Sequence, residues 1–222
     1  MARDSGPVAV CVINLKGGVG KSTIAALLAR DGFRRGLDVL AIDLDPQANL
    51  SQGLMHDSYA VFLKNKHPSI VEIFNGYRPP TATAATSGPL NHQDAVVQIA
   101  FENARSLDLI PCRFDFSDNL IGSVCPDPKT LARFLDREFR SKDLILIDCA
   151  PTESILTTAA YHASGKVLVP VKPEYFATIG FPLLQQSLEN FRNQNRGQVI
   201  DVCGVVITNQ ALKQISYCNQ AA

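Results

Sequence analysis

The sequence predicts an α/β protein built on a doubly wound, mostly parallel sheet that is flanked by helices. Two observations lead to this fold class. Short runs rich in Val, Ile and Leu alternate along the chain with segments of helical periodicity. In addition, the glycine-rich stretch "NLKGGVGKST" at residues 14–23 directly follows the first apolar run and directly precedes the first helical segment. The chain has 222 residues, of which 46% are hydrophobic, so it can form one substantial core.

The first half of the chain begins with "VAVCVIN" at 8–14, an apolar run that we expect to be a buried strand. A helix is expected at 22–35, because its apolar residues form one stripe and a glycine stands near its end. The runs "VLAID" at 39–43 and "LDLI" at 107–110 are the second and third expected strands. Between them, residues 77–94 are rich in Pro, Thr, Ala and Gly and predict an irregular surface insertion.

The second half repeats the alternation of helix and strand. Its first helix, at 129–140, carries Leu131, Phe134 and Leu135 on one face. Strands are expected at 144–148, 167–171 and 199–208, and further helices at 152–164, 179–195 and 210–218. Pro182 falls in the first turn of the helix at 179–195, where proline is tolerated. The simplest organisation is one domain over residues 1–222 with an irregular insertion.

Charge and cysteine content exclude several classes of protein. The 21 basic and 21 acidic residues cancel, so no net charge draws the chain onto nucleic acid or a membrane. No apolar stretch approaches the length of a transmembrane helix, and the N-terminus lacks a signal-peptide core. Six cysteines contain no C-x-x-C pair, which argues against a zinc ribbon or a thioredoxin-type site. We expect Cys11, Cys149 and Cys203 to be small buried hydrophobes in a reduced, cytoplasmic protein.

The stretch at residues 14–23 has the composition and the placement of a phosphate-binding loop. Gly17, Gly18 and Gly20 allow the backbone to approach phosphate oxygens, and the following helix adds the positive end of its dipole. A glycine-rich turn that binds nothing is the alternative. The three residues that close the loop have separate expected roles: the β- and γ-phosphates for Lys21, Mg²⁺ for Ser22 and the α-phosphate for Thr23.

The loop departs from the usual G-x-x-x-x-G-K-[ST] pattern in one respect. Leu15 stands where the first glycine belongs, and the next residue is a second cation, Lys16. The residues themselves do not explain why a site already served by Lys21 carries another lysine.

Two further apolar runs end in carboxylates. Asp43 and Asp45 follow the second strand in "AIDLDPQANL", on the crevice side where open α/β sheets bind ligands. Such a pair can support Mg²⁺ through water or hold the attacking water in phosphoryl transfer, whereas the alternative is a turn that starts at Asp-Pro. Asp148 ends "LILID" and is expected to anchor the water shell of Mg²⁺. Cys149 beside it has no suitably spaced partner for an iron–sulfur cluster, so packing is the simpler interpretation.

Taken together, these motifs resemble the ParA/MinD family of deviant Walker ATPases, which are P-loop NTPases and include the nitrogenase iron protein. The resemblance is closest to the ParA (Soj-like) branch, which partitions plasmids, chromosomes and other cargo. It is carried in family order by "KGGVGKST", "IDLDPQANLS", "LDLIPCRFDF", "LILIDCAPTES" and "VPVKPEYFATIG". One mild departure is Ala150, which replaces a proline of the family pattern.

The resemblance implies a role for each site residue. Lys16 would be the signature lysine that reaches across a nucleotide-sandwich dimer to the phosphates of the other subunit, where a cation offsets the repulsion between two ATP-loaded faces. Asp45 would orient or activate the attacking water, while Asp43, Asp148 and Ser22 would serve Mg²⁺. The implied nucleotide-binding residues are Gly17, Gly18, Val19, Gly20, Lys21, Ser22, Thr23 and Asn209. Asn209 would contact adenine, although an ordinary helix-capping asparagine is the alternative.

The resemblance also implies partners. Late helices of ParA relatives hold nonspecific DNA, so Arg192, Arg196 and Lys213 are the candidate contacts, with a solvated helix face as the alternative. Relatives normally continue with another strand and helices beyond the position of Ala222, and we therefore expect a truncated chain, a degraded partner or a compact variant. No C-terminal amphipathic helix is present, so a membrane is not expected as a partner.

The function implied is that of a ParA-like ATPase with ATP and Mg²⁺ as cofactors and weak intrinsic hydrolysis. ATP would drive homodimerisation and switch affinity for nonspecific DNA, and a ParB-like protein would stimulate hydrolysis; location would be cytoplasmic and, with DNA, on the nucleoid. Two alternatives stay open. One is an ATP-dependent positioning or scaffolding ATPase that acts on a protein or membrane without DNA. The other is a metabolic P-loop enzyme, which would need a small-molecule pocket or a cysteine-ligated cluster.

Overall fold

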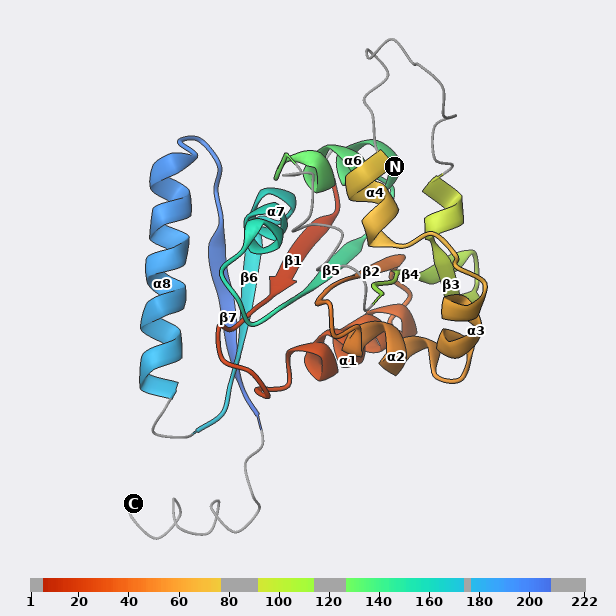
Figure 1. Cartoon of the computed structure of the whole chain (residues 1–222), viewed down its shortest axis with the longest axis horizontal. Coiled ribbons are helices and arrows are strands. Elements are labelled where there is room, and N and C mark those ends of the chain that lie inside the picture. The colour runs from red at the N-terminus through yellow and green to blue at the C-terminus, as the bar shows by residue number, and fades with distance from the viewer. Residues whose placement is uncertain (1–5, 77–91, 114–126, 174–176, 209–222) are drawn as a thin grey trace, which may run out of the picture.

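A seven-stranded sheet forms the centre of the computed structural model, which describes residues 6–76, 92–113, 127–173 and 177–208 (Figure 1). The strands lie in the order β3-β4-β2-β5-β1-β6-β7. All neighbours pair in parallel except β3 and β4, which are antiparallel. The doubly wound, mostly parallel sheet predicted from the sequence is therefore confirmed. The strands span Val8–Val12 (β1), Val39–Leu44 (β2), Val97–Glu102 (β3), Arg105–Ile110 (β4), Leu144–Cys149 (β5), Lys166–Val171 (β6) and Asp201–Ile207 (β7).

Helices cover both faces of this sheet. The chain passes from β1 to β2 in one direction along the sheet, and from β4 to β5 and β5 to β6 in the other. Right-handed crossovers then place the first connecting helix on one face and the later ones on the opposite face. The helices span Lys21–Arg34 (α1), Asn49–Met55 (α2), Ser58–Lys64 (α3), Ile70–Gly76 (α4), Thr130–Glu138 (α6), Ile155–Ala163 (α7) and Ala177–Gln194 (α8), with a 3₁₀ turn at His92–Ala95 (η1).

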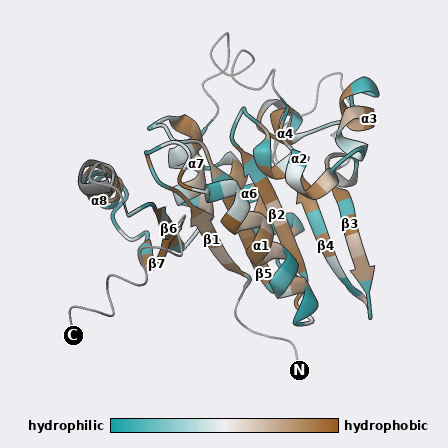
Figure 2. Ribbon diagram, turned by 90° about the horizontal axis from the view of Figure 1, so that it is seen from below, coloured by the Kyte–Doolittle hydropathy of each residue, from teal (hydrophilic) through white to brown (hydrophobic). Residues whose placement is uncertain are grey.

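The core lies around the central strands. All six residues of β2 are buried, and Figure 2 shows hydrophobic residues concentrated on β1, β2 and β5. On the face opposite α1, Tyr161 of α7 packs edge-on against Phe191 of α8, with ring centroids 5.3 Å apart. Strands buried on both faces read as continuous apolar runs, which explains why these elements could be predicted.

Several elements escaped the sequence analysis. The helices α2, α3 and α4 have seven residues each, which is too short for a helical period to stand out. Strand β3 joins β4 through a turn at Asn103 and Ala104, both with positive φ (51° and 59°). Glycine usually occupies such positions, and because neither residue is glycine the sequence carries no clear hairpin signal. Of the expected insertion at 77–94, residues 77–91 lie outside the described residues, as does the helix expected at 210–218.

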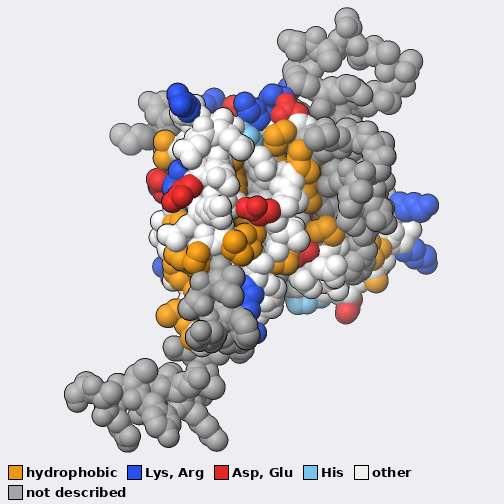
Figure 3. Space-filling view, turned by 60° about the vertical axis from the view of Figure 1, so that its left-hand side comes forward, with side chains coloured by type: hydrophobic (Ala, Val, Ile, Leu, Met, Phe, Trp, Pro, Cys, Tyr) orange, Lys and Arg blue, Asp and Glu red, His pale blue; other side chains and the backbone are white. Residues whose placement is uncertain are grey.

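One cysteine prediction was wrong. Cys11 and Cys149 are buried as expected, but Cys203 is exposed because β7 is the edge strand of the sheet. The same strand exposes Val202, Val205 and Ile207, at 38%, 48% and 62% of their surface. Figure 3 shows hydrophobic side chains at the surface on the side of the molecule where α8 and β7 lie. In the described part of the chain, no further strand pairs with β7.

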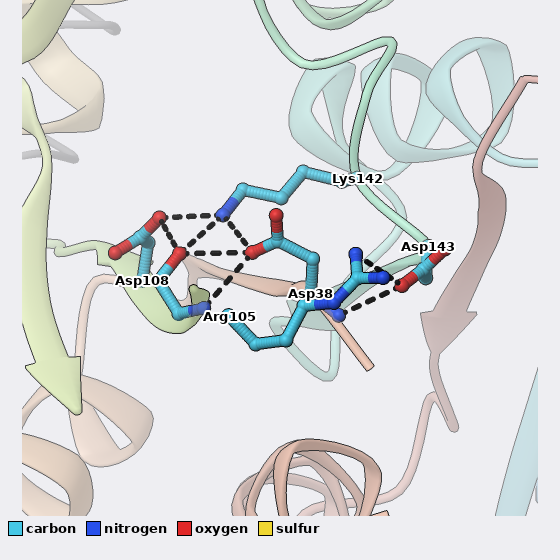
Figure 4. A network of polar contacts seen from close by, with 6 residues as sticks. Asp38, Arg105, Asp108, Lys142 and Asp143 are labelled. Atoms are coloured by element: carbon cyan, nitrogen blue, oxygen red, sulfur yellow. Dashed lines mark hydrogen bonds and ion pairs between the residues drawn. The ribbon is translucent and has the colours of Figure 1, made fainter. Parts of the chain in front are cut away.

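A polar network links β2, β4 and β5 on the amino-terminal side of the sheet, away from the glycine-rich loop (Figure 4). The Lys142 ammonium donates to Asp38 at 2.8 Å, to Asp108 at 2.6 Å and to Ser106 at 2.7 Å. Asp143 in turn accepts a hydrogen bond from the Asp38 backbone at 2.9 Å. Asp38 stands directly before β2, and Lys142 and Asp143 directly before β5, so the network fixes the sheet edge opposite the glycine-rich loop. No helix in the described segments is both long enough and apolar enough to cross a membrane.

Candidate functional site

The glycine-rich loop connects the carboxyl end of β1 to the first residue of α1, Lys21. Two of its glycines adopt the left-handed conformation, Gly18 with φ 68° and Gly20 with φ 87°. Gly20 also caps α1, and a methyl group built on it would meet Thr208 at 3.7 Å. Glycine is therefore required twice in this loop, because other residues rarely adopt this conformation.

Asn14 fixes the loop to the sheet. Its side chain is 2% exposed and donates from Nδ2 to the Pro170 carbonyl of β6 at 2.8 Å. Its Oδ1 accepts the backbone N–H of Lys16 at 2.9 Å. A methyl group built on Gly180 of α8 would come within 3.2 Å of the same oxygen. One amide thus joins the start of the loop to β6 beneath α8, a role that the sequence analysis did not assign.

Lys21 is buried within the loop, with 6% of its surface exposed. Its Nζ donates to the Lys16 carbonyl at 3.2 Å. Burial lowers the pKa of Lys21, although the nearby carboxylates of Asp148 and Asp45 act in the opposite direction. A cation in such surroundings gains from a further anionic ligand, as the prediction for this residue requires.

The two aspartates after β2 have different surroundings. Asp43 is completely buried and accepts the hydroxyl of Ser51 at 2.7 Å, the backbone N–H of Ser51 at 2.8 Å and that of Asp45 at 3.1 Å. Burial raises the pKa of Asp43 to about 6, against the effect of these hydrogen bonds. Ser51 also accepts the Cys112 backbone N–H at 2.9 Å, so it ties Asp43 to the end of β4. Asp45 accepts the Gln47 backbone N–H at 2.9 Å and lines the cavity over the loop.

Asp148 lies beside Asp43, because the two are register partners on β5 and β2. It is completely buried, and neither carboxylate oxygen has a hydrogen-bond partner among the described residues. Burial raises the pKa of Asp148 well above its ordinary value, and the Asp43 carboxylate adds to the effect, whereas Ser22 and Lys21 oppose it. A buried carboxylate without a donor is costly, which indicates that it serves a ligand.

A cavity of about 910 Å³ opens over the loop. The loop glycines Gly17, Gly18 and Gly20 line it together with Lys21, Ser22, Thr23 and Asp45, so the structure brings these candidate residues together around one cavity. Val19 does not line this cavity. It is 1% exposed, and its carbonyl accepts the Thr208 hydroxyl at 2.8 Å. Lys16 is half-buried at the start of the loop. Asn209 and Lys213 lie outside the described residues.

The other candidates lie away from this cavity. Arg192 lies in the last turn of α8 and Arg196 follows that helix. Arg192 Nε donates to the Ile200 carbonyl at 3.0 Å, just before β7. They therefore stand near the amino end of β7, opposite the loop. Cys149 is buried, and no group of three or more metal-ligating side chains occurs among the residues described. Packing remains the simpler interpretation of that cysteine.

Comparisons with known proteins agree with this geometry. The model of the AAA domain family matches residues 8–200. The chromosome partitioning protein ParA of Caulobacter vibrioides is 30% identical over 211 residues, which cover 90% of this chain and 68% of that protein. The chain spans 57 to 74% of the length of four curated relatives that it matches.

Solved structures share the fold. A cobyrinic acid a,c-diamide synthase from Mycobacterium smegmatis, with bound ATP analogue and magnesium, has a TM-score of 0.72 at 23% identity, covering 97% of this chain and 82% of that one. A plasmid partition protein from Borrelia burgdorferi has a TM-score of 0.71 at 19% identity, covering 97% and 87%. The loop, the order of the motifs and these matches lead to one conclusion: the chain belongs to the ParA/MinD family of P-loop ATPases.

Proposed function

We propose that this protein is a partition-type ATPase that binds Mg·ATP at the loop, dimerises face to face and hydrolyses ATP slowly. ATP would switch its affinity for nonspecific DNA, and a ParB-like partner would stimulate hydrolysis in the cytoplasm. The observation that carries the proposal is the pair formed by a buried cation, Lys21, and a buried carboxylate without a donor, Asp148, under one glycine-rich loop.

The residues present fit a magnesium ion. Mg²⁺ prefers hard oxygen ligands and keeps several waters, and it is often held through only one or two carboxylates plus phosphate oxygens. Asp148 offers two oxygens that have no donor in the described chain, and the hydroxyl of Ser22 lines the neighbouring cavity. The chemistry that Mg²⁺ would supply is neutralisation of charge on the phosphate oxygens.

The chain's own residues would do the rest. The backbone of the loop cradles the phosphates, Lys21 neutralises them and Asp45 holds the attacking water. Lys16 reaches the partner's nucleotide, which makes dimerisation depend on ATP. Support for Lys16 is its position at the start of the loop, where its backbone is fixed by Asn14.

DNA is the proposed surface because a relative of 30% identity is a chromosome partitioning protein. Arg196 is exposed and Arg192 keeps 43% of its side chain exposed beside Asp201, so both can approach phosphates. Binding through such contacts depends strongly on salt, since it releases counterions. Lys213 and the adenine contact of Asn209 stay proposals from the resemblance.

The test is binding to a DNA duplex of arbitrary sequence, with and without Mg·ATP, at low and high salt. We expect binding that requires ATP and weakens with salt, and that is lost in Lys21→Ala. Absence of DNA binding despite measured ATP uptake would instead favour a positioning ATPase that acts without DNA. Sizing by light scattering with ATP tests the dimer: Lys16→Ala should bind ATP and stay monomeric, and a monomeric wild type would contradict the proposal.

A further inference from the structure

A third lysine stands at the phosphate loop. Lys172 is the first residue after β6, at the carboxyl edge of the sheet. A methyl group built on Gly18 would come 4.0 Å from its Nζ, so the ammonium lies against the outer side of the loop. Within the described segments, Lys172 forms no hydrogen bond or ion pair, whereas Lys21 and Lys166 both have partners.

The space beside Lys172 continues the nucleotide site. A second cavity, of about 450 Å³, is lined by Lys172, Ile207 and Thr208 on one side and by the loop and Thr23 on the other. Three residues, Gly18, Gly20 and Thr23, line both this cavity and the larger one. A nucleotide with its terminal phosphates over Lys21 would therefore extend past Thr23 toward Lys172.

The end of β7 holds this arrangement in place. The Thr208 backbone N–H donates to the Val171 carbonyl at 2.8 Å, directly before Lys172, and its hydroxyl donates to the Val19 carbonyl at 2.8 Å. The backbone that carries Lys172 is thus tied to the loop through one residue. A lysine on a fixed stem, whose donors no described residue occupies, suits a phosphate group.

We propose that Lys172 is a nucleotide-contacting residue that binds the phosphate nearest the nucleoside, in the same chain, from the β6 side of the loop. This inference rests on the proposed binding of Mg·ATP and extends it. The nucleotide would lie between two cations of one subunit, Lys21 at the terminal phosphates and Lys172 at the other end. Lys172 would then recognise mononucleotides, including those too short to reach Lys21.

The test is a titration of the full chain with a fluorescent ATP analogue, followed by displacement with ATP, ADP, AMP and adenosine. Lys172→Gln should weaken ATP, ADP and AMP by about tenfold or more, the loss expected for one charge-assisted hydrogen bond, and leave adenosine unchanged. Lys172→Arg should restore most of the affinity. Lys166→Gln is the matched control, because Lys166 lies at the other end of β6 and pairs with Asp201 at 3.5 Å.

Two results would overturn the inference. One is that Lys172→Gln binds ATP, ADP and AMP with wild-type affinity. The other is that Lys172→Gln loses as much affinity for adenosine as for the three nucleotides. The thermal unfolding of Lys172→Gln without nucleotide should match that of the wild type. Lys172→Met, which keeps the alkyl stem, must show the same loss of affinity for ATP, ADP and AMP. If the wild type bound no nucleotide, the proposed function itself would fail; if it bound normally and only the Lys172 effect were missing, the proposed function would stand.

Discussion

Asp43 and Asp148 lie side by side as register partners on neighbouring parallel strands, yet among the described residues only Asp43 of this pair has hydrogen-bond donors. Asp43 is held by Ser51 and by the backbone, so its position is fixed before any ligand arrives. Asp148 has no donor in the described chain, so its charge is compensated only by a ligand or by protonation. The two carboxylates of one pair therefore differ in hydrogen bonding: Asp43 is held by the chain, and Asp148 has both oxygens open to a ligand.

Asp148→Asn should stabilise the nucleotide-free protein while removing the magnesium dependence of ATP binding. The native pKa of Asp148 is raised, so its unfavourable contribution to stability grows as the pH rises above the ordinary pKa of an aspartate and is complete only above the raised native pKa. We therefore expect a gain of about 1–3 kcal/mol in the free energy of unfolding that is larger at pH 8 than at pH 5. Denaturant unfolding at the two pH values measures it, and a loss of stability in the variant would contradict the assignment.

Ser51→Ala should affect both stability and hydrolysis. It removes the hydroxyl that donates to Asp43 and accepts from Cys112, at a cost of about 1–2 kcal/mol. Because Asp43 loses a donor next to the site, ATP turnover should fall as well. Ser58→Ala on α3 is the control, since its hydroxyl donates to the Met55 carbonyl at 2.6 Å and to no other group in the part of the chain that the structure describes. Equal turnover in the two variants would refute a positioning role for Ser51.

Asn14→Ala should loosen the loop. It leaves the Pro170 carbonyl and the Lys16 N–H without their partner, which should cost about 2 kcal/mol of stability. ATP affinity should fall by about tenfold, because the loop must then be ordered by the ligand. Asn195→Ala, whose amide donates to the Phe191 carbonyl at 2.9 Å in α8, should lose stability without losing affinity.

Lys142→Met should destabilise the sheet without changing nucleotide affinity. It leaves Asp38 and Asp108 facing each other, at a cost of about 2–4 kcal/mol. Burial tends to raise the pKa of Asp38, but the hydrogen bonds from Lys142 and Ser106 outweigh it and lower the pKa below 3.8.

The stability that Asp38 contributes is therefore present above its ordinary pKa and is lost as the pH falls below about 4. When the free energy of unfolding is measured as the pH is lowered, it should fall less steeply in Asp38→Asn than in the wild type. Identical acid profiles would show that this network does not stabilise the sheet.

The sequence predicted what depends on local pattern. The strand, glycine loop and helix around Lys21 form a contiguous motif, and "LILID" is a continuous apolar run, so both elements were predicted where the structure has them, while the roles of their residues stay predictions. The supporting residues were missed for a physical reason. Asn14 bonds to Pro170, 156 positions away along the chain, and Ser51 bonds to Cys112, 61 positions away, so only the folded sheet brings these groups together.

The edge of β7 that no described strand covers bears on how the purified protein behaves. A seven-residue strand that exposes Val205 and Ile207 and has a free edge in the described chain is a template for another strand. Concentrated solutions should therefore associate edge to edge and form aggregates even when the fold is intact. A lysine at Val205, placed on this edge, would be the simplest way to keep the protein dispersed.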